Sequence, residues 1–182
     1  LYDRKRKVVV LGRDPLGVKP LYYASAPDGL LFGSEPKALL KHRGFMPETD
    51  LGAAATYLQM EYYPAPLTPF REMKKLLPGH VLIARSPSDI GIRRYHSWKF
   101  DDLSGVPEEE IAVMIRRKVT ESVSSQLVAD VPLGVFLSGG VDSACVAAAM
   151  KASGAEVRSF SIGFEDKDFD ESGHAKKAAL HL

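Results

Sequence analysis

Short apolar runs separated by Gly, Pro and Asp characterise the first part of the chain. They predict strands at residues 8–11, 21–24, 30–34, 81–84 and 92–95. Asp28-Gly29 lies between two of these runs and predicts a hairpin, as does the turn-rich stretch 86–91. Helices are predicted at 36–40, which begins at Pro36, and at 51–60, where Asp50 is the expected N-cap. Residues 62–70 are expected to be extended, because three prolines exclude a helix there.

Longer elements are predicted after residue 105. Three glutamates at 108–110 precede an apolar stripe that recurs every four residues, at Ile111, Ile115, Val119, Val123 and Leu127. This spacing predicts an amphipathic helix. A buried strand is predicted at 131–137, a helix at 144–153, a strand at 157–162 and a helix at 171–182. A strand, a helix and a strand of these lengths imply a parallel βαβ unit, so the fold class is α/β.

The stretch Phe136-Leu137-Ser138-Gly139-Gly140-Val141-Asp142-Ser143 joins the predicted strand to the predicted helix. Gly139 and Gly140 allow the backbone to come close to a ligand. Asp142 and Ser143 fall at the helix start, where unpaired N–H groups and the helix dipole attract an anion. Together these features predict a phosphate-binding loop; the alternative is an ordinary turn in which Ser and Asp cap the helix. A Walker A loop is excluded, because no Gly-Lys-Ser/Thr follows.

Composition narrows the function classes only slightly. The 182 residues are 45% hydrophobic and 26% charged, and the net charge is +1, so no bulk field favours nucleic acid or an acidic membrane. Cys145 is the only cysteine, which excludes an intrachain disulfide, and we expect a small buried thiol there. The histidines have no recognisable metal-ligand spacing. No membrane-spanning run or signal peptide is apparent, which predicts a cytoplasmic protein.

Several motifs resemble known families. Ser138 to Ser143 resembles the pyrophosphate loop (PP-loop) of ATP pyrophosphatases. Residues 13–23 (RDPLGVKPLYY) and 34–40 (SEPKALL) resemble the end of a glutaminase domain of the N-terminal-nucleophile (Ntn) type. Within the first motif, we expect Arg13 and Asp14 to form a local ion pair that stabilises a turn. The motifs at 75–80, 94–98, 130–137, 159–164 and 169–171 follow in the order typical of glutamine-hydrolysing asparagine synthetases, so the similarity spans nearly the whole chain.

The resemblance implies a division into three parts. Residues 1–45 would be the end of an αββα Ntn-type glutaminase domain and 46–104 an interdomain connection with a helix and a hairpin. Residues 105–182 would begin a parallel-sheet, HUP-like domain that binds adenine nucleotides. Because the chain starts at Leu1 and stops inside a predicted helix, we expect it to be an internal fragment of a longer protein.

The resemblance also implies an activity. Enzymes of this family are carbon–nitrogen ligases that hydrolyse glutamine in one domain and send ammonia to the other. There, ATP activates aspartate as β-aspartyl-AMP, and ammonia displaces AMP to give asparagine. The small-molecule partners would therefore be ATP, aspartate and glutamine, with Mg²⁺ as cofactor and no nucleic acid or membrane partner; a homodimer stays open.

Site residues follow by position within the resemblance. Ser138, Gly139, Gly140, Val141, Asp142 and Ser143 would hold the phosphates of ATP, and Asp142 would bind Mg²⁺. Leu137 and Ile162 would flank adenine, although a plain place in the strand core is an equal alternative. No catalytic residue falls within the chain: position 1 is Leu where the family has its cysteine nucleophile, and the acceptor pocket would lie beyond Leu182. The chain alone is therefore expected not to hydrolyse glutamine.

Two other functions remain open on these motifs. The first is a paralogue that adenylates another carboxylate, such as a β-lactam synthetase or a cell-envelope amidotransferase. The second is a non-catalytic nucleotide-binding or scaffold protein. The pocket for the acceptor carboxylate would distinguish the paralogue from an asparagine synthetase.

Overall fold

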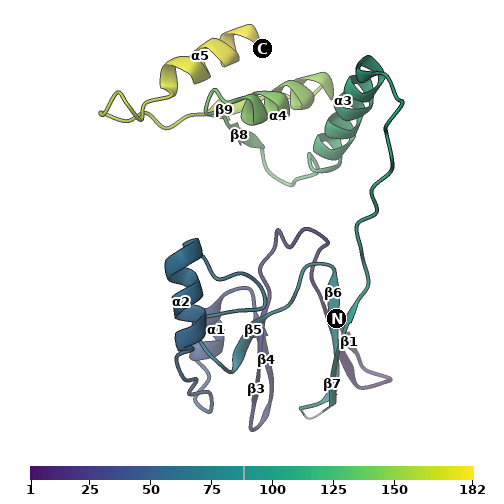
Figure 1. The fold of residues 1–182 in the computed structure, drawn as a ribbon, viewed down its shortest axis with the longest axis vertical. Coiled ribbons are helices and arrows are strands. Elements are labelled where there is room, and N and C mark those ends of the chain that lie inside the picture. The colour runs from purple at the N-terminus through teal and green to yellow at the C-terminus, as the bar shows by residue number, and fades with distance from the viewer. Residues whose placement is uncertain (88) are drawn as a thin grey trace. The chain divides into compact units, whose positions relative to one another are not determined.

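A computed structural model describes residues 1–87 and 89–182, which form two compact units, Leu1–Phe100 and Asp101–Leu182. Each unit combines helices with strands, as Figure 1 shows, and this confirms the predicted α/β class. No helix within the described residues is both long enough and apolar enough to cross a membrane.

Two antiparallel sheets form the first unit. One sheet has the order β1-β2-β6-β7, with the bounds Tyr2–Asp3, Val8–Gly12, His80–Ser86 and Asp89–Arg94. The other has the order β4-β3-β5, with the bounds Gly29–Gly33, Tyr22–Ala26 and Met73–Lys75. Val9 pairs with Ala84, so residues that were expected to form an interdomain connection share a sheet with β2. The two predicted hairpins are confirmed by the β3–β4 and β6–β7 pairings; residue 88 of the second turn lies outside the described residues.

The helices of this unit match their predicted ranges. α1 spans Pro36–Leu40, and α2 spans Leu51–Met60, where the Asp50 side chain accepts a hydrogen bond from the backbone N–H of Ala53 as expected. Leu39 of α1 packs with Phe45 and with Met73 of β5 in one buried cluster. A second cluster, formed by Leu11, Leu76, Leu82 and Ala84, lies beside β2 and β6.

The proline-rich segment 62–70 contains no helix or strand, as predicted, and polar side chains attach it to the fold. Thr68 is fully buried, and its Oγ1 lies 2.8 Å from the carbonyl oxygen of Met73 and 2.9 Å from that of Phe70. The Lys75 ammonium donates to the carbonyl of Tyr63. Burial, together with the nearby Arg13 guanidinium, lowers the pKa of Lys75. These contacts provide hydrogen-bond donors for the carbonyls of Tyr63, Phe70 and Met73.

Arg13 and Asp14 organise the loop after β2, but not as an ion pair. The Arg13 guanidinium donates to the carbonyls of Gly17 (2.8 Å), Lys19 (3.1 Å) and Leu76 (2.7 Å). The Asp14 carboxylate accepts from the N–H groups of Val18 (2.9 Å) and Lys19 (3.0 Å). The expected ion pair is therefore wrong: across residues 1–87 and 89–182, each of these charges binds backbone groups and not the other. Loop carbonyls and N–H groups without other partners compete successfully for both side chains.

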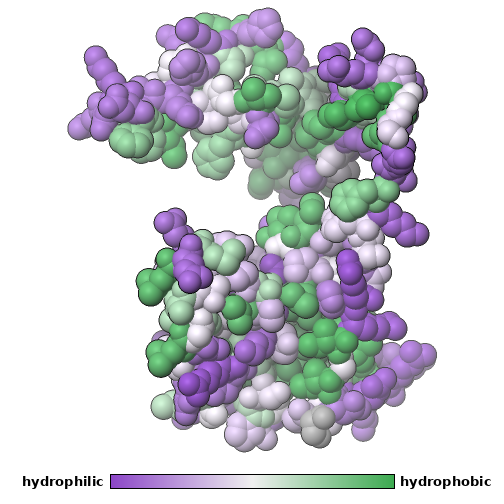
Figure 2. Space-filling model, viewed as in Figure 1, coloured by the Kyte–Doolittle hydropathy of each residue, from purple (hydrophilic) through white to green (hydrophobic). Residues whose placement is uncertain are grey.

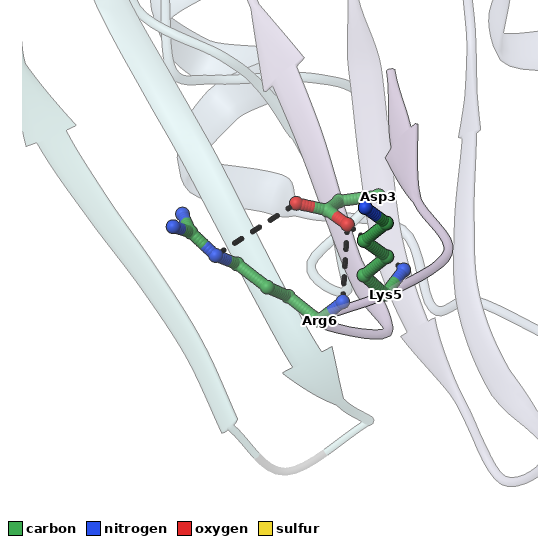
Figure 3. Close-up of polar contacts among 3 residues, drawn as sticks. All are labelled: Asp3, Lys5 and Arg6. Atoms are coloured by element: carbon green, nitrogen blue, oxygen red, sulfur yellow. Dashed lines mark hydrogen bonds and ion pairs between the residues drawn. The ribbon is translucent and has the colours of Figure 1, made fainter.

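A second carboxylate closes the turn between β1 and β2. Asp3 accepts from the backbone N–H groups of Lys5 and Arg6, both at 3.0 Å, and its other oxygen lies 4.0 Å from the Arg6 guanidinium (Figure 3). The Arg6 side chain is 84% exposed, so this ion pair adds little stability, and the backbone bonds fix the turn.

The second unit contains the predicted βαβ arrangement. It comprises α3 (Glu108–Ser125), β8 (Gly134–Phe136), α4 (Val141–Ala152), β9 (Arg158–Phe160) and α5 (Ser172–His181). β8 and β9 are parallel, with Val135 paired to Ser159, which confirms the predicted parallel sheet. Both strands are shorter than predicted, because their ladder extends over three residue pairs. Leu137, Ala147 and Ala175 form the buried cluster of this unit.

The apolar stripe of α3 is only partly covered: Ile115 and Val119 are exposed, and Ile111, Val123 and Leu127 are half-buried. The helix exists where it was predicted, but Ile115 is 58% exposed and α3 contains no buried residue. Figure 2 shows hydrophobic residues at the surface along this helix. Cys145 is also exposed, so the expectation of a buried thiol is wrong. The buried positions of α4 are Ala147, Ala149 and Met150.

The Asp14 bonds generate a pH-dependent prediction. Hydrogen bonds from the Lys19 and Val18 N–H groups lower the pKa of Asp14. A lowered folded-state pKa means that ionised Asp14 stabilises the fold above the unfolded-state value of about 3.9, and that this contribution is lost as the pH falls through the folded-state value. Asp14→Asn should therefore lower the urea midpoint at pH 7, and the difference from wild type should shrink towards pH 3.

Glu61→Gln is the matched control, because it removes an exposed carboxylate of the same unit. It should leave the urea midpoint nearly unchanged at every pH. An Asp14→Asn difference that is constant from pH 7 to pH 3 would contradict this role of the ionised carboxylate.

Candidate functional site

The predicted phosphate loop lies between the end of β8 at Phe136 and the start of α4 at Val141. Gly139 has a φ of 86°, a left-handed conformation that side-chain-bearing residues rarely adopt, and Gly140 is the N-cap of α4. Asp142 and Ser143 lie in the first turn of the helix, where the sequence places them. The loop therefore has the strand–turn–helix geometry that a phosphate-binding loop requires.

Two serine hydroxyls brace this loop from within. The Oγ atoms of Ser138 and Ser143 lie 3.1 Å apart, and Ser143 donates to the carbonyl of Gly140 at 3.1 Å. The backbone N–H of Gly140 donates to Ser138 Oγ, and that of Ser138 donates to Ser143 Oγ, both at 3.3 Å. The side chains thus fix the loop conformation before any ligand binds.

The start of α4 presents unused hydrogen-bond donors. The first helical bond of α4 runs from the Ala144 N–H to the Gly140 carbonyl. Within the described part of the chain, the N–H groups of Val141, Asp142 and Ser143 have no acceptor. Three free donors at the positive end of a helix dipole favour an anion.

Asp142 does not cap the helix. It is exposed, and within residues 1–87 and 89–182 its carboxylate has no hydrogen-bond or ion-pair partner. The alternative that Asp142 is an ordinary helix cap therefore has no hydrogen bond to support it, and Gly140 takes the N-cap position.

The start of α5 lies directly against the loop. A Cβ at position 139 would be 2.5 Å from the Cβ of His174 and 2.7 Å from the backbone nitrogen of Ala175, closer than real Cβ contacts. Ala175 is 3% exposed and packs with Leu137 and Ala147. Gly139 is therefore required both by its backbone conformation and by the space it leaves for α5.

A cavity of about 240 Å³ opens beside the loop, at the carboxyl ends of β8 and β9. Leu137 and Ile162, the two residues predicted to flank adenine, both line it. Leu137 is 2% exposed and belongs to the buried cluster of this unit, whereas Ile162 is 68% exposed. Ser161 donates to the carbonyl of Leu137 at 2.6 Å and joins the two strand ends. The volume is below the roughly 300–1,000 Å³ of whole-ligand pockets, so it suits one part of a larger ligand.

Aromatic residues form much of the cavity wall, and the sequence did not mark them as site residues. They are Phe136, Phe160, Phe164 and Phe169. Phe136 pairs with Phe160 across the two strands, which the strand register would have indicated once it was known. Phe164 and Phe169 come from the loop before α5, and their placement depends on the loop conformation.

The cavity offers no positively charged side chain to an anion. Among the described residues that line it, none is Lys or Arg, and one, Glu171, is acidic. The described residues contain no group of three or more His, Cys, Asp or Glu side chains that could hold a metal ion. Asp142 would then be a single protein ligand, which is compatible with Mg²⁺, an ion that keeps several waters and binds through one or two carboxylates and substrate phosphates.

Comparison with known families assigns both units. Residues 1–96 match the glutamine amidotransferase domain family, and residues 114–182 match the asparagine synthase family. The chain belongs to the glutamine-hydrolysing asparagine synthetase family. In this member of the synthetase family, the amidotransferase match falls in the unit Leu1–Phe100 and the asparagine synthase match in the unit Asp101–Leu182.

Individual relatives agree with the assignment. The chain is 32% identical over 182 residues to asparagine synthetase [glutamine-hydrolyzing] 1 of Bacillus subtilis, covering 100% of this chain and 28% of the relative. It is 30% identical over 181 residues to putative asparagine synthetase [glutamine-hydrolyzing] 2 of Methanocaldococcus jannaschii, covering 97% of this chain and 35% of the relative. A third relative, amidase chyE of Penicillium rubens, is 31% identical over 200 residues, covering 100% and 29%. The chain thus spans about a third or less of the length of these relatives.

The contact between Gly139 and α5 generates a stability prediction. Gly139→Ala should lower the free energy of unfolding more than Gly154→Ala does, by about 1–3 kcal/mol, because the new methyl group displaces α5. Gly154 is the matched control: it has a φ of 79°, and a Cβ at position 154 would have no heavy atom within 4 Å, so its substitution carries the backbone strain alone. Urea unfolding followed by circular dichroism measures both variants. Equal losses would show that the α5 contact does not constrain position 139.

Proposed function

We propose that the chain is part of an ATP-dependent asparagine synthetase in which residues 137–143 and the adjoining cavity bind ATP. The observation that carries the proposal is the set of free N–H groups at the start of α4, beside a cavity at the carboxyl ends of two parallel strands. Nucleotides in such sheets bind at this edge. The phosphates would lie on the loop and the adenine in the cavity.

Each loop residue would have a distinct task. The N–H groups of Val141, Asp142 and Ser143 would donate to phosphate oxygens, and the Ser138 and Ser143 hydroxyls would keep the loop in shape. Gly139 would let α5 approach the loop, and Gly140 would begin the helix. Leu137 and Ile162 would flank the adenine base. Donors that are already in place stabilise a leaving pyrophosphate without reorganisation.

Asp142 is the proposed Mg²⁺ ligand. Its unpartnered carboxylate lies in the same helix turn as the proposed phosphate donors, where it would repel the phosphates of ATP in the absence of a cation. Mg²⁺ held by the Asp142 carboxylate would neutralise the charge of the phosphates at this helix turn. The lack of Lys or Arg along the cavity makes this neutralisation more important.

The complete reaction would use both halves of a longer protein. The unit Leu1–Phe100 would belong to an Ntn-type domain that hydrolyses glutamine and supplies ammonia. The unit Asp101–Leu182 would begin the HUP-like domain in which ATP activates aspartate as β-aspartyl-AMP. The cysteine nucleophile and the aspartate pocket would lie outside the 182 residues, and we propose a cytoplasmic location.

A second candidate is a paralogue that adenylates a different carboxylate. This candidate is supported by the similarity to amidase chyE and to amidase chry2 of Gibberella zeae, because the similarity to these two proteins named amidases extends over most of this chain. ATP–pyrophosphate exchange in the complete protein, measured with aspartate and with other carboxylates, separates the two. Exchange that depends on aspartate supports the synthetase, and exchange that depends on another acid supports the paralogue.

Asp142→Asn tests the proposed metal role in the complete protein. The exchange keeps the size of the side chain and removes its charge. Because the carboxylate has no partner in the described structure, we expect the free energy of unfolding to change by no more than about 0.5 kcal/mol. We expect pyrophosphate release to fall by roughly 100-fold or more, the scale of one lost electrostatic stabiliser.

The matched control is Asp130→Asn, which removes an exposed carboxylate upstream of β8, at the amino end of that strand. It should leave pyrophosphate release near the wild-type level, and glutamine hydrolysis should survive in both variants. Near-wild-type pyrophosphate release from Asp142→Asn at limiting Mg²⁺ would exclude the metal role.

A further inference from the structure

One carboxylate, that of Asp170, links Phe164 to the start of α5 within the loop that joins β9 to α5. Asp170 Oδ1 accepts from the backbone N–H of Ser172 at 3.1 Å and from that of Phe164 at 3.4 Å. Asp170 Oδ2 accepts from the Ser172 hydroxyl at 2.9 Å. The bond to Phe164 spans six residues and folds the second part of the loop back on itself, while the bonds to Ser172 fix the start of α5.

The closed loop forms one wall of the cavity. Phe164 and Phe169 line the cavity, yet they are 56% and 70% exposed, so burial in the core does not hold their rings. The other bonds within the loop are local: the N–H of Asp168 donates to the Asp166 side chain, and that of Phe169 to the Asp166 carbonyl. Asp170 is therefore the side chain that connects Phe164 in this wall to the start of α5.

We infer that Asp170 is a positioning residue for the base side of the nucleotide site, because it holds the loop so that Phe164 and Phe169 face the cavity. This role rests on the proposed function, in which the cavity takes adenine. Aromatic rings beside a planar base contribute stacking as well as apolar contact. Asp170 itself would not touch the nucleotide.

A helix cap alone does not account for these contacts. The residue at the N-cap of α5 is Glu171, which makes no side-chain cap bond, and a cap would not need the Phe164 bond. The hydrogen bonds from Ser172 also lower the pKa of Asp170, so the carboxylate is ionised and accepts at both oxygens at neutral pH. Asparagine has one amide oxygen for the two backbone N–H groups, and its amide nitrogen cannot accept from the Ser172 hydroxyl.

The test compares two ligands that differ in the base. Binding of Mg²⁺–ATP and of Mg²⁺–triphosphate, the inorganic ion without adenosine, is measured by calorimetry on the complete protein. Asp170→Ala should weaken ATP binding by about tenfold, the scale of one or two lost hydrogen bonds. Triphosphate binding should change by less than about twofold, because it depends on the loop at 138–143. Asp170→Asn should fall between wild type and Asp170→Ala.

Asp166→Ala is the matched control, since Asp166 is a carboxylate of the same loop that accepts a local backbone N–H at 3.0 Å and does not link Phe164 to α5. It should leave ATP binding within about twofold of wild type. Should Asp170→Ala fail to fold, Phe164→Leu gives the same readout with Asp170 intact, because it removes the ring and keeps an apolar side chain. It should also weaken ATP binding selectively.

Three results would overturn the inference. Equal losses of affinity for ATP and for triphosphate in Asp170→Ala would show that Asp170 supports the fold in general. A loss of ATP affinity in Asp166→Ala equal to that in Asp170→Ala would show that Asp170 has no specific role in positioning the rings. Unchanged ATP binding in Phe164→Leu would exclude the ring from the site. A wild-type protein that binds neither ligand would instead overturn the proposed nucleotide site, and with it this role of Asp170.

Discussion

The second unit depends on one close approach, that of the first turn of α5 to the backbone of Gly139. Because position 139 has no side chain, His174 and Ala175 come within contact distance of the loop. Ala175 then completes the buried cluster with Leu137 and Ala147, and the start of α5 forms one side of the cavity. A single glycine thus links the loop conformation, the packing of the unit and the shape of the candidate site.

The first unit meets a different constraint, the satisfaction of backbone carbonyls in long connections between short strands. Arg13, Lys75 and Thr68 accomplish this with side-chain donors that reach the carbonyls of Leu76, Tyr63 and Met73. A partly buried carbonyl without a hydrogen bond lowers the stability of the fold. These polar residues therefore stabilise the structure, which the pattern of polar and apolar residues in the sequence does not indicate. They hold the proline-rich segment and the β2–β3 loop on the two sheets.

The sequence predicted the elements that depend on local chemistry and missed features that depend on tertiary contacts. α2 begins after the Asp50 cap as expected, and the βαβ unit follows from apolar runs of the right length. β1 and β5 were missed, because two and three residues of mixed polarity carry no periodic signal. The expected Arg13–Asp14 ion pair was wrong, because the carbonyl of Leu76, 63 positions away in sequence, binds the Arg13 guanidinium, while the local N–H groups of Val18 and Lys19 bind the Asp14 carboxylate. Phe164 and Phe169 were not marked as site residues, because a hydrogen bond across the loop places them.

The pairing of β2 with β6 has a consequence for biosynthesis. Val9 pairs with Ala84, which is 75 positions later in the chain, so β2 cannot complete its sheet until that much more polypeptide has left the ribosome. At a translation rate of about 5–20 residues per second, synthesis of these residues takes roughly 4–15 s. During that time, the apolar face of β2 and its unpaired edge are open to other chains. Folding of the first unit in the cell is therefore timed by the emergence of β6, and a nascent-chain chaperone has a defined window in which to act.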